Sequence, residues 1–546
     1  MPEEPAAPQA AKAPRQGDLI IPPTMVRQGP TKTGKHSAGS APNPVGLKSI
    51  LLLIVLTLLA FAPTLNSDLL WSEYDEVERS AHTSMESWQE AWQIENIRRH
   101  DPITITSYFL EAQLPLHPAA THRLINLFLH LFAALLLLKV LECLKLPGAF
   151  AAALVFALHP AVLQTLYWPG YRTEILGLVF ILASLYFGIR NRHARDYTLT
   201  ILLTFIAAFL HPAALALPFV LGLAILFQHK TFHLHHYNRV LPLGLIVLFV
   251  GAWTQSATVA NARPEDLSLS TQVGQNLYFF LRQALLPIDL RLFHPFTEGK
   301  TYNVGAANSL LAFLVFLPFY VLIAFNYRKG WAKGFFLGLS SFLLLLVYGL
   351  MQTGRFLDGH LAKEEYGLYI ALPAIIAVVF CGLAGFFRQM PSLGKILWPL
   401  GFSLFLLVHF GLTASFSYSL RDPAHMWQKL AGQWENSWQP RAALLASIDE
   451  TNNDLLTENE TIRALETILA INPSRHGERI QLARLYRKNR QNTNALREYQ
   501  LILRQTQPDK EFLQEAADFF DSLNLRWEAN KARERITNTN ATTPEE

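Results

Sequence analysis

The apolar run LKSILLLIVLTLLAFAPTL, Leu47–Leu65, decides the fold class, because it is long enough to cross a bilayer as one helix. A cleaved signal peptide would need its apolar core closer to Met1 and a small-residue cleavage site after it. We therefore expect a retained first transmembrane span. The preceding residues, 1–46, are rich in Pro, Ala, Gly and basic side chains, which predicts a disordered cytoplasmic tail.

The rest of the chain continues this apolar character. Of the 546 residues, 51% are hydrophobic and 16% are charged, whereas soluble domains carry about a quarter charged residues. This composition argues against an ordinary soluble enzyme, and two cysteines cannot form a disulfide framework. Further apolar runs raise the expected number of spans to about eleven in a membrane domain over 47–416. They lie at 124–141, 148–167, 174–189, 197–210, 213–227, 239–256, 304–325, 334–351, 367–387 and 395–416.

The loops between these runs predict an orientation. With the N-terminus inside, nearly all inner loops are basic, as the positive-inside rule requires. The outer loops are then 66–123, 257–303 and 352–366, together with everything after about residue 417. The net charge of +4 is explained by this topology, so we expect a lipid bilayer as partner and no nucleic acid.

The C-terminal residues, 417–546, form a polar stretch that predicts a separate soluble helical domain. Leu482, Ala483 and Tyr486 recur further along as Ala516, Ala517 and Phe520, with one constant separation. This separation equals the period of tetratricopeptide helix pairs, which is about 34 residues. We therefore predict a tetratricopeptide-like α-solenoid. A generic helical bundle is the alternative.

Chemistry is expected first where the first outer loop begins, at Glu73-Tyr74-Asp75-Glu76. Neighbouring carboxylates repel one another, so one of them should hold a proton or pair with a cation. Such a carboxylate is a candidate general base for an acceptor hydroxyl. A divalent cation at these outer carboxylates is the one cofactor to consider, and no other metal site is expected. A merely solvated loop would have the same sequence.

Basic side chains on the predicted outer face are candidates for binding phosphate. Arg172 offers bidentate binding, although arginines at this depth also extend to lipid headgroups. His211 lies in an outer break at His211-Pro212 and is either a phosphate donor or a packed histidine. The other candidates belong to charged outer segments and could equally form surface salt bridges: His100, Arg355 and Lys363.

Taken in order, these segments resemble the transmembrane and tetratricopeptide repeat-containing glycosyltransferases of the C-type membrane fold, including bacterial O-mannosyltransferase-like members. The resemblance covers about residues 48–535. It rests on the acidic motif after the first span, the histidine-proline turns and the C-terminal repeats. The segments that carry it are Glu73–Glu76, Leu124–His130, Ala157–Pro160 with Arg172–Glu174, Phe209–Ala213, Leu281–Pro295 and Glu364–Pro373.

The resemblance implies an inverting transferase that uses a polyprenyl-phosphate sugar on the outer membrane face. Asp75 or Glu76 would then act as the base, with Glu73 beside them, and Arg172 and His211 would hold the phosphate with a cation near Lys363. The family usually shows two aspartates where this chain has Asp75-Glu76, and lysine before proline where it has His211. A longer side chain shifts the base by about one methylene, which is costly in rate.

The sequence thus predicts an all-α polytopic membrane protein that transfers a sugar to a hydroxyl of a protein or glycan. The repeats, through residues such as Tyr486 and Phe520, would form a platform for the acceptor. A non-catalytic scaffold for envelope or pilus assembly is one alternative, and an oligosaccharide polymerase or ligase is another. In a bacterium, the membrane would be the inner one and the repeats periplasmic.

Overall fold

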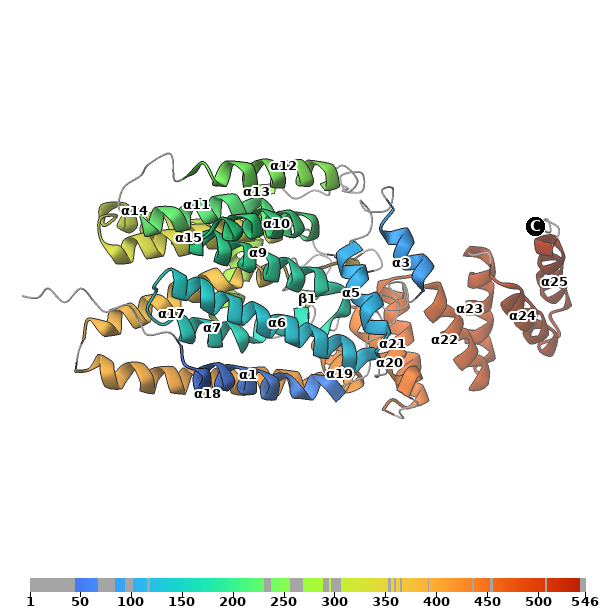
Figure 1. Ribbon diagram of the computed structural model, residues 1–546. Coiled ribbons are helices and arrows are strands. Elements are labelled where there is room, and N and C mark those ends of the chain that lie inside the picture. The colour runs from blue at the N-terminus through green and yellow to red at the C-terminus, as the bar shows by residue number, and fades with distance from the viewer. Residues whose placement is uncertain are drawn as a thin grey trace, which may run out of the picture. The chain divides into compact units, whose positions relative to one another are not determined.

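A computed structural model gives the arrangement of the chain from the first apolar helix onward (Figure 1). The structure describes residues 45–66, 84–93, 102–114, 118–229, 237–255, 269–287, 294–295, 306–351, 355–357, 360–363, 366–390, 392–434, 437–451, 455–505 and 508–540.

The apolar part of the chain is helical, and its long helices run side by side (Figure 1). They coincide with the hydrophobic runs, because a backbone in hydrocarbon must satisfy its own hydrogen bonds. The long helices are α1 (Leu47–Phe61), α6 (Pro118–Cys143), α7 (Ala149–Ala157), α9 (Arg172–Arg190), α10 (Ala194–Leu210), α11 (Leu217–Gln228), α12 (Val240–Gln255), α14 (Ala306–Phe325), α15 (Gly330–Met351), α17 (Leu372–Arg388) and α18 (Gly394–Ser419).

Shorter elements connect them. Between α1 and α6 these are η1 (Ala62–Asn66), α3 (Met85–Ala91) and α5 (Pro102–Ala112). The Ser84 side chain caps α3 by accepting a backbone N–H of its first turn. The remaining elements are η2 (Pro160–Val162), α8 (Leu163–Tyr167), η3 (Pro169–Tyr171), η4 (Pro212–Ala216), α16 (Tyr366–Tyr369) and the longer α13 (Leu269–Leu285).

Among the described residues, five helices are long and apolar enough to cross a membrane, and a sixth span results if the bent pair α7 and Pro160–Tyr167 is one span. The protein is therefore a multi-pass membrane protein with about five spans. The sequence-based number of about eleven counted every apolar run. Four of the remaining apolar helices are shorter, at 10–17 residues, and stay predicted spans: Pro212–Gln228, Val240–Trp253, Phe316–Phe325 and Leu372–Arg388.

Proline explains two of the breaks. The α10 helix ends at Leu210, and Pro212 opens a short 3-10 turn before α11, so the expected break at His211-Pro212 is present. The same Leu-His-Pro-Ala sequence stands at 158–161, where α7 ends and η2 begins. In both copies a histidine nitrogen accepts the backbone N–H two residues later, at 3.2 Å from Ala161 N and at 3.0 Å from Ala213 N. The histidine thus caps the turn that the proline starts.

One small antiparallel sheet lies among the described residues of the later loops. It consists of β1 (His294–Pro295), β2 (Arg355–Leu357) and β3 (His360–Lys363), in the order β1-β3-β2. The register pairs Arg355 with Ala362 and His294 with Lys363. The expectation of an all-α chain therefore holds for the long elements. The small sheet was not expected.

The C-terminal region is also helical, as its polar, helix-favouring sequence predicted. Three helices in this region, α21, α23 and α25, begin at residues 458, 492 and 526, at the spacing that the sequence repeat predicted. Its own apolar core includes Tyr499, which stacks on Phe512 and Phe519 with ring centroids 5.3 and 4.8 Å apart. The helices are α19 (Pro423–Gln433), α20 (Gln439–Thr451), α21 (Glu458–Ile471), α22 (His476–Lys488), α23 (Asn492–Gln505), α24 (Lys510–Ser522) and α25 (Arg526–Asn540).

Candidate functional site

Two charged side chains in the first turn of α9 define the candidate site. Arg172 and Glu174 are two residues apart, which separates them by about 200° around a helix of 3.6 residues per turn. They therefore point to opposite sides of α9. Arg172 faces α5 and α6, and Glu174 faces His211 at the end of α10. The beginning of α6, the beginning of α9 and the end of α10 meet at this end of the helices.

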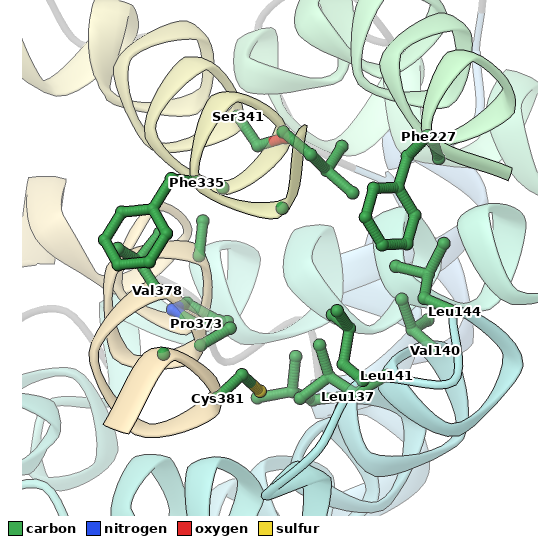
Figure 2. A pocket seen from close by; sticks show the side chains of 18 of the residues that line it. Leu137, Val140, Leu141, Leu144, Phe227, Phe335, Ser341, Pro373, Val378 and Cys381 are labelled. Carbon is green, nitrogen blue, oxygen red and sulfur yellow. The ribbon is translucent and has the colours of Figure 1, made fainter. Parts of the chain in front are cut away.

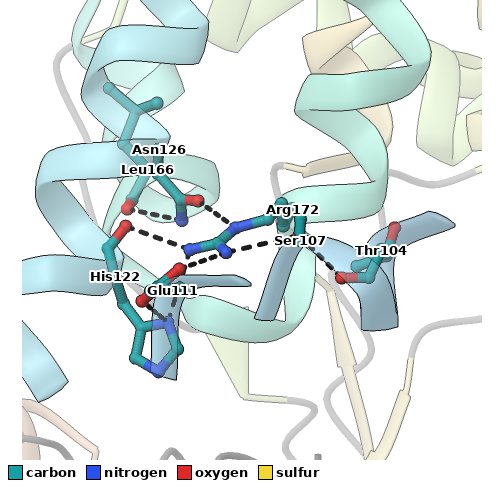
Figure 3. A network of polar contacts seen from close by, with 7 residues as sticks. All are labelled: Thr104, Ser107, Glu111, His122, Asn126, Leu166 and Arg172. Atoms are coloured by element: carbon teal, nitrogen blue, oxygen red, sulfur yellow. Dashed lines mark hydrogen bonds and ion pairs between the residues drawn. The ribbon is translucent and has the colours of Figure 1, made fainter. Parts of the chain in front are cut away.

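Arg172 forms the centre of a buried ion-pair network (Figure 3). Its guanidinium is 0% exposed, and it pairs with the carboxylate of Glu111 from α5. The second oxygen of that carboxylate contacts Nδ1 of His122 near the start of α6. Glu111 and His122 are 5% and 7% exposed, so all three groups are withdrawn from water. Burial of this kind requires that each charge be paired.

Neutral groups occupy the remaining guanidinium donors. Arg172 Nε donates to Asn126 Oδ1 at 2.8 Å, and Nη1 lies 3.4 Å from Ser107 Oγ. The Asn126 amide in turn donates to the carbonyl of Leu166 at 3.2 Å, which ties α6 to α8. The network therefore fixes four elements, α5, α6, α8 and α9, around one arginine (Figure 3).

An aromatic side chain closes the network on one side. The guanidinium carbon of Arg172 lies 4.5 Å from the ring centroid of Tyr108, a cation–π contact. The same ring meets His122 edge-on at 5.6 Å. Tyr108 belongs to α5, as do Glu111 and Ser107, so one short helix supplies most of the partners of Arg172.

The second pair joins Glu174 to His211. Glu174 Oε2 lies 2.8 Å from His211 Nε2, and the two side chains are almost fully buried. His211 also meets Tyr348 of α15 edge-on at 4.6 Å. Because Ala213 N–H donates to Nδ1, that nitrogen carries a lone pair, and the ring proton belongs on Nε2, facing the carboxylate.

Close backbone approach makes the second pair possible. Gly177 lies one turn after Glu174, and a Cβ added there would come within 2.8 Å of His211 Cβ. Only a residue without a side chain lets the end of α10 lie so near α9. Gly177 is therefore a structural requirement of the Glu174–His211 contact.

The structure places the predicted site residues in three different situations. Arg172 and His211 lie at the same end of the helices, but each already has a carboxylate partner. Arg355 and Lys363 lie on β2 and β3 of the small sheet. The predicted catalytic carboxylates and the remaining predicted cation lie outside the described residues: Glu73, Asp75, Glu76 and His100.

The expected platform residues, Tyr486 and Phe520, are core residues of the C-terminal region. They are 3% and 0% exposed, so they can set the spacing of the helices but do not present their own rings to an acceptor. Burial, followed by a hydrogen bond to Glu466, raises the pKa of Tyr486 above its usual value. Its hydroxyl is thus held neutral inside the repeat region.

The carboxylate partners of Arg172 and His211 were not assigned from the sequence. Glu111 is the one acidic residue of the apolar helix PITITSYFLEA, and an isolated charge in such a helix is the signal that could have singled it out. Among the described residues, no group of three or more His, Cys, Asp or Glu side chains could hold a metal ion. The predicted cation position at the outer carboxylates lies outside those residues.

Comparison with known proteins adds no relative: no family model matches the chain, and no curated protein matches it.

Proposed function

We propose that the protein is a membrane glycosyltransferase that moves a sugar from a polyprenyl-phosphate donor to a hydroxyl of a protein or glycan. The observation that carries the proposal is the burial of five ionisable side chains at one end of the apolar helices. Ionisable groups inside a membrane domain are costly and usually mark a functional site. The five are Glu111, His122, Arg172, Glu174 and His211.

The reaction in this proposal is a single displacement. The acceptor oxygen attacks the anomeric carbon of the sugar, and the bond from that carbon to the phosphate oxygen breaks. Asp75 or Glu76 takes the hydroxyl proton, and the polyprenyl phosphate leaves as an anion. Positioning of the hydroxyl and stabilisation of the departing phosphate lower the barrier.

The ion pairs suggest how the donor phosphate is received. A phosphate presents oxygens to a guanidinium in the same forked geometry as a carboxylate. In the proposal, the donor therefore displaces Glu111 from Arg172, and His211 is oriented by Glu174 beside it. Lys363 and Arg355 supply further positive charge from the small sheet. Glu73 and His100 belong to the same predicted outer loop as the base, residues 66–123.

The C-terminal region supports the assignment of an acceptor platform. Three of its helices begin at residues 458, 492 and 526, with the spacing of tetratricopeptide helix pairs, and such stacks present an extended concave surface. Tyr486 and Phe520 would hold that surface in shape from within. The acceptor would then be a protein or a glycan bound by exposed residues of the same helices.

A transfer assay on the full chain tests the proposal. The protein is reconstituted in lipid with radiolabelled polyprenyl-phosphate sugars and extract acceptors, beside the double variant Asp75→Asn/Glu76→Gln. Glu86→Gln is the matched control, because Glu86 is an exposed carboxylate on α3 of the same outer segment. We expect transfer by the parent and the control, and none by the double variant.

A membrane scaffold is the second candidate, favoured by the fact that Arg172 and His211 already have carboxylate partners. Its partners would be recruited by the C-terminal helices. Deletion of the residues after about 420 would then abolish function while the double carboxylate variant kept it, the reverse of the transferase expectation. An oligosaccharide polymerase or ligase would instead lengthen a glycan in the same assay.

A further inference from the structure

A large apolar cavity lies between five helices (Figure 2). Its volume is about 690 Å³, and its walls come from α6, α9, α11, α15 and α17. Figure 2 shows leucines of α6 on one side, with Phe335 and Val378 on the other. The volume falls within the range of about 300–1,000 Å³ typical of ligand pockets.

The cavity opens toward one end of the helices and reaches far into them. Lys145 follows α6, Gly330 begins α15 and Gln389 follows α17, and all three line the cavity. Leu345 lines it fifteen residues after Gly330, which is about 22 Å along α15 at about 1.5 Å per residue. This depth is about three quarters of a hydrocarbon core of roughly 30 Å. The cavity is therefore deep enough to receive an extended acyl chain.

The polarity of the walls matches a lipid with a charged head. The lining residues are apolar over almost the whole depth, and the one charged lining residue, Lys145, is exposed at the end of α6. No ion pair of Lys145 is present within the described part of the chain. The first residues of α15, Gly330 and Trp331, lie at the same end, and helix N-termini favour anions.

Lys145 adopts an uncommon backbone conformation. Its φ is +56°, in the left-handed region that glycine adopts at no steric cost. Its N–H donates to Glu142 O at 2.9 Å, and Leu146 N–H donates to Leu141 O at 3.1 Å, the pattern in which glycine normally ends a helix. Glycine therefore suits this backbone position at least as well as lysine.

A second polar group faces the cavity without a partner. The Ser341 hydroxyl forms no hydrogen bond within the described residues, although the residue is 6% exposed (Figure 2). A fully packed helix interface would not leave space beside an unsatisfied hydroxyl. This observation is independent of Lys145 and indicates that the cavity is a site to be filled rather than a tight helix contact.

We infer that the cavity binds one acyl chain of an anionic membrane phospholipid, whose phosphate pairs with Lys145. The acyl chain provides hydrocarbon that matches the apolar walls, and the ammonium group of Lys145 provides the positive charge that pairs with the phosphate. On the predicted orientation this end faces the cytoplasm, where anionic lipids are concentrated. The inference does not depend on the transferase proposal, because it concerns neither the ion pairs nor the carboxylates.

Native mass spectrometry of the full chain in detergent tests this assignment, with phosphatidylglycerol and phosphatidylcholine of identical acyl chains as probes. We expect phosphatidylglycerol to bind about fivefold more tightly, since one basic residue near a lipid surface contributes about 1 kcal/mol. Lys145→Gly should abolish this preference without lowering the melting temperature, because glycine suits the backbone there. Ser341→Leu should narrow the deep part of the cavity and weaken binding of both lipids, again without unfolding the protein.

The control is Lys395→Gln, which removes a charge at the same end of the helices from a residue that does not line the cavity. Equal retention of both lipids by the parent protein would overturn the inference. The inference would also be wrong if Lys145→Gly reduced the preference for phosphatidylglycerol no more than Lys395→Gln does, or if Ser341→Leu bound both lipids as tightly as the parent protein. If a polyprenyl phosphate displaced phosphatidylglycerol at equal concentration, the occupant would be the donor chain and the phospholipid assignment would be wrong.

Discussion

At the scale of single residues, Arg172 is the most constrained side chain of the candidate site. It is fully buried, and every donor nitrogen has a partner. The sequence indicated that Arg172 was important but could not show why. The partner Glu111 lies 61 residues earlier, on a different helix, and only tertiary packing brings the two together.

Glu111→Gln should therefore destabilise the protein strongly. Removing one partner of a buried ion pair leaves the other charge uncompensated and costs about 3–5 kcal/mol. Thermal unfolding of the full chain in detergent measures the change. Glu142→Gln is the matched control, because its pair with Lys139 is partly exposed and should cost about 1 kcal/mol or less.

The double variant Glu111→Leu/Arg172→Leu should be more stable than Glu111→Gln alone, because it buries no unpaired charge. If the double variant lost as much stability as Glu111→Leu and Arg172→Leu lose in sum, Glu111 and Arg172 would act independently. The ion-pair network would then not be the organising feature of this end of the helices.

Gly177→Ala should also destabilise, for a steric reason. The added Cβ would lie 2.8 Å from His211 Cβ, and such overpacking costs about 1–3 kcal/mol. Gly401→Ala and Gly411→Ala in α18 have nothing within 4 Å and should be neutral or stabilising, as alanine favours helices. A melting temperature unchanged by Gly177→Ala would contradict the close approach of α9 and α10.

At the scale of elements, the sequence predicted well what depends on local pattern. The break at His211-Pro212, the helix after Tyr171 and the regular spacing of α21, α23 and α25 all follow from proline, hydropathy and repeat period. Two features were not predictable in this way. The small sheet joins residues near 294 to residues near 360, and α5 acquires its role by packing on α6 and α9.

The C-terminal helices should become less stable at alkaline pH. Burial, followed by hydrogen bonds to Glu466 and Glu515, raises the pKa of Tyr486 and Tyr499. A raised pKa stabilises the fold below the unfolded value of about 10, and this contribution is lost as pH rises toward the raised pKa. Each tyrosine should lower the free energy of unfolding by about 1.4 kcal/mol per pH unit in that window.

Circular dichroism of thermal unfolding, followed together with tyrosinate absorbance, measures this effect. The variant Tyr486→Phe/Tyr499→Phe should start from a lower stability, because it loses both hydrogen bonds, but its stability should fall less steeply with pH. Parallel curves for the parent and the variant would mean that other groups cause the alkaline loss.

At the scale of the whole molecule, the number of spans decides on which side the C-terminal helices lie. Five spans, or the eleven expected from hydropathy, place the two termini on opposite sides of the membrane, whereas six place them on the same side. The basic inner loops predict a cytoplasmic N-terminus. Protease protection of tags at the two ends should therefore show one protected terminus in sealed vesicles, and equal protection of both would favour an even number.

Transfer of a sugar on the face opposite the N-terminus can be measured in sealed vesicles of known orientation. These carry labelled polyprenyl-phosphate sugars in the bilayer and receive a membrane-impermeant acceptor from outside. We predict labelled acceptor only when the face opposite the N-terminus is outward, and none with Asp75→Asn/Glu76→Gln. Transfer that persists in the double variant, or its absence in both orientations, would contradict the account.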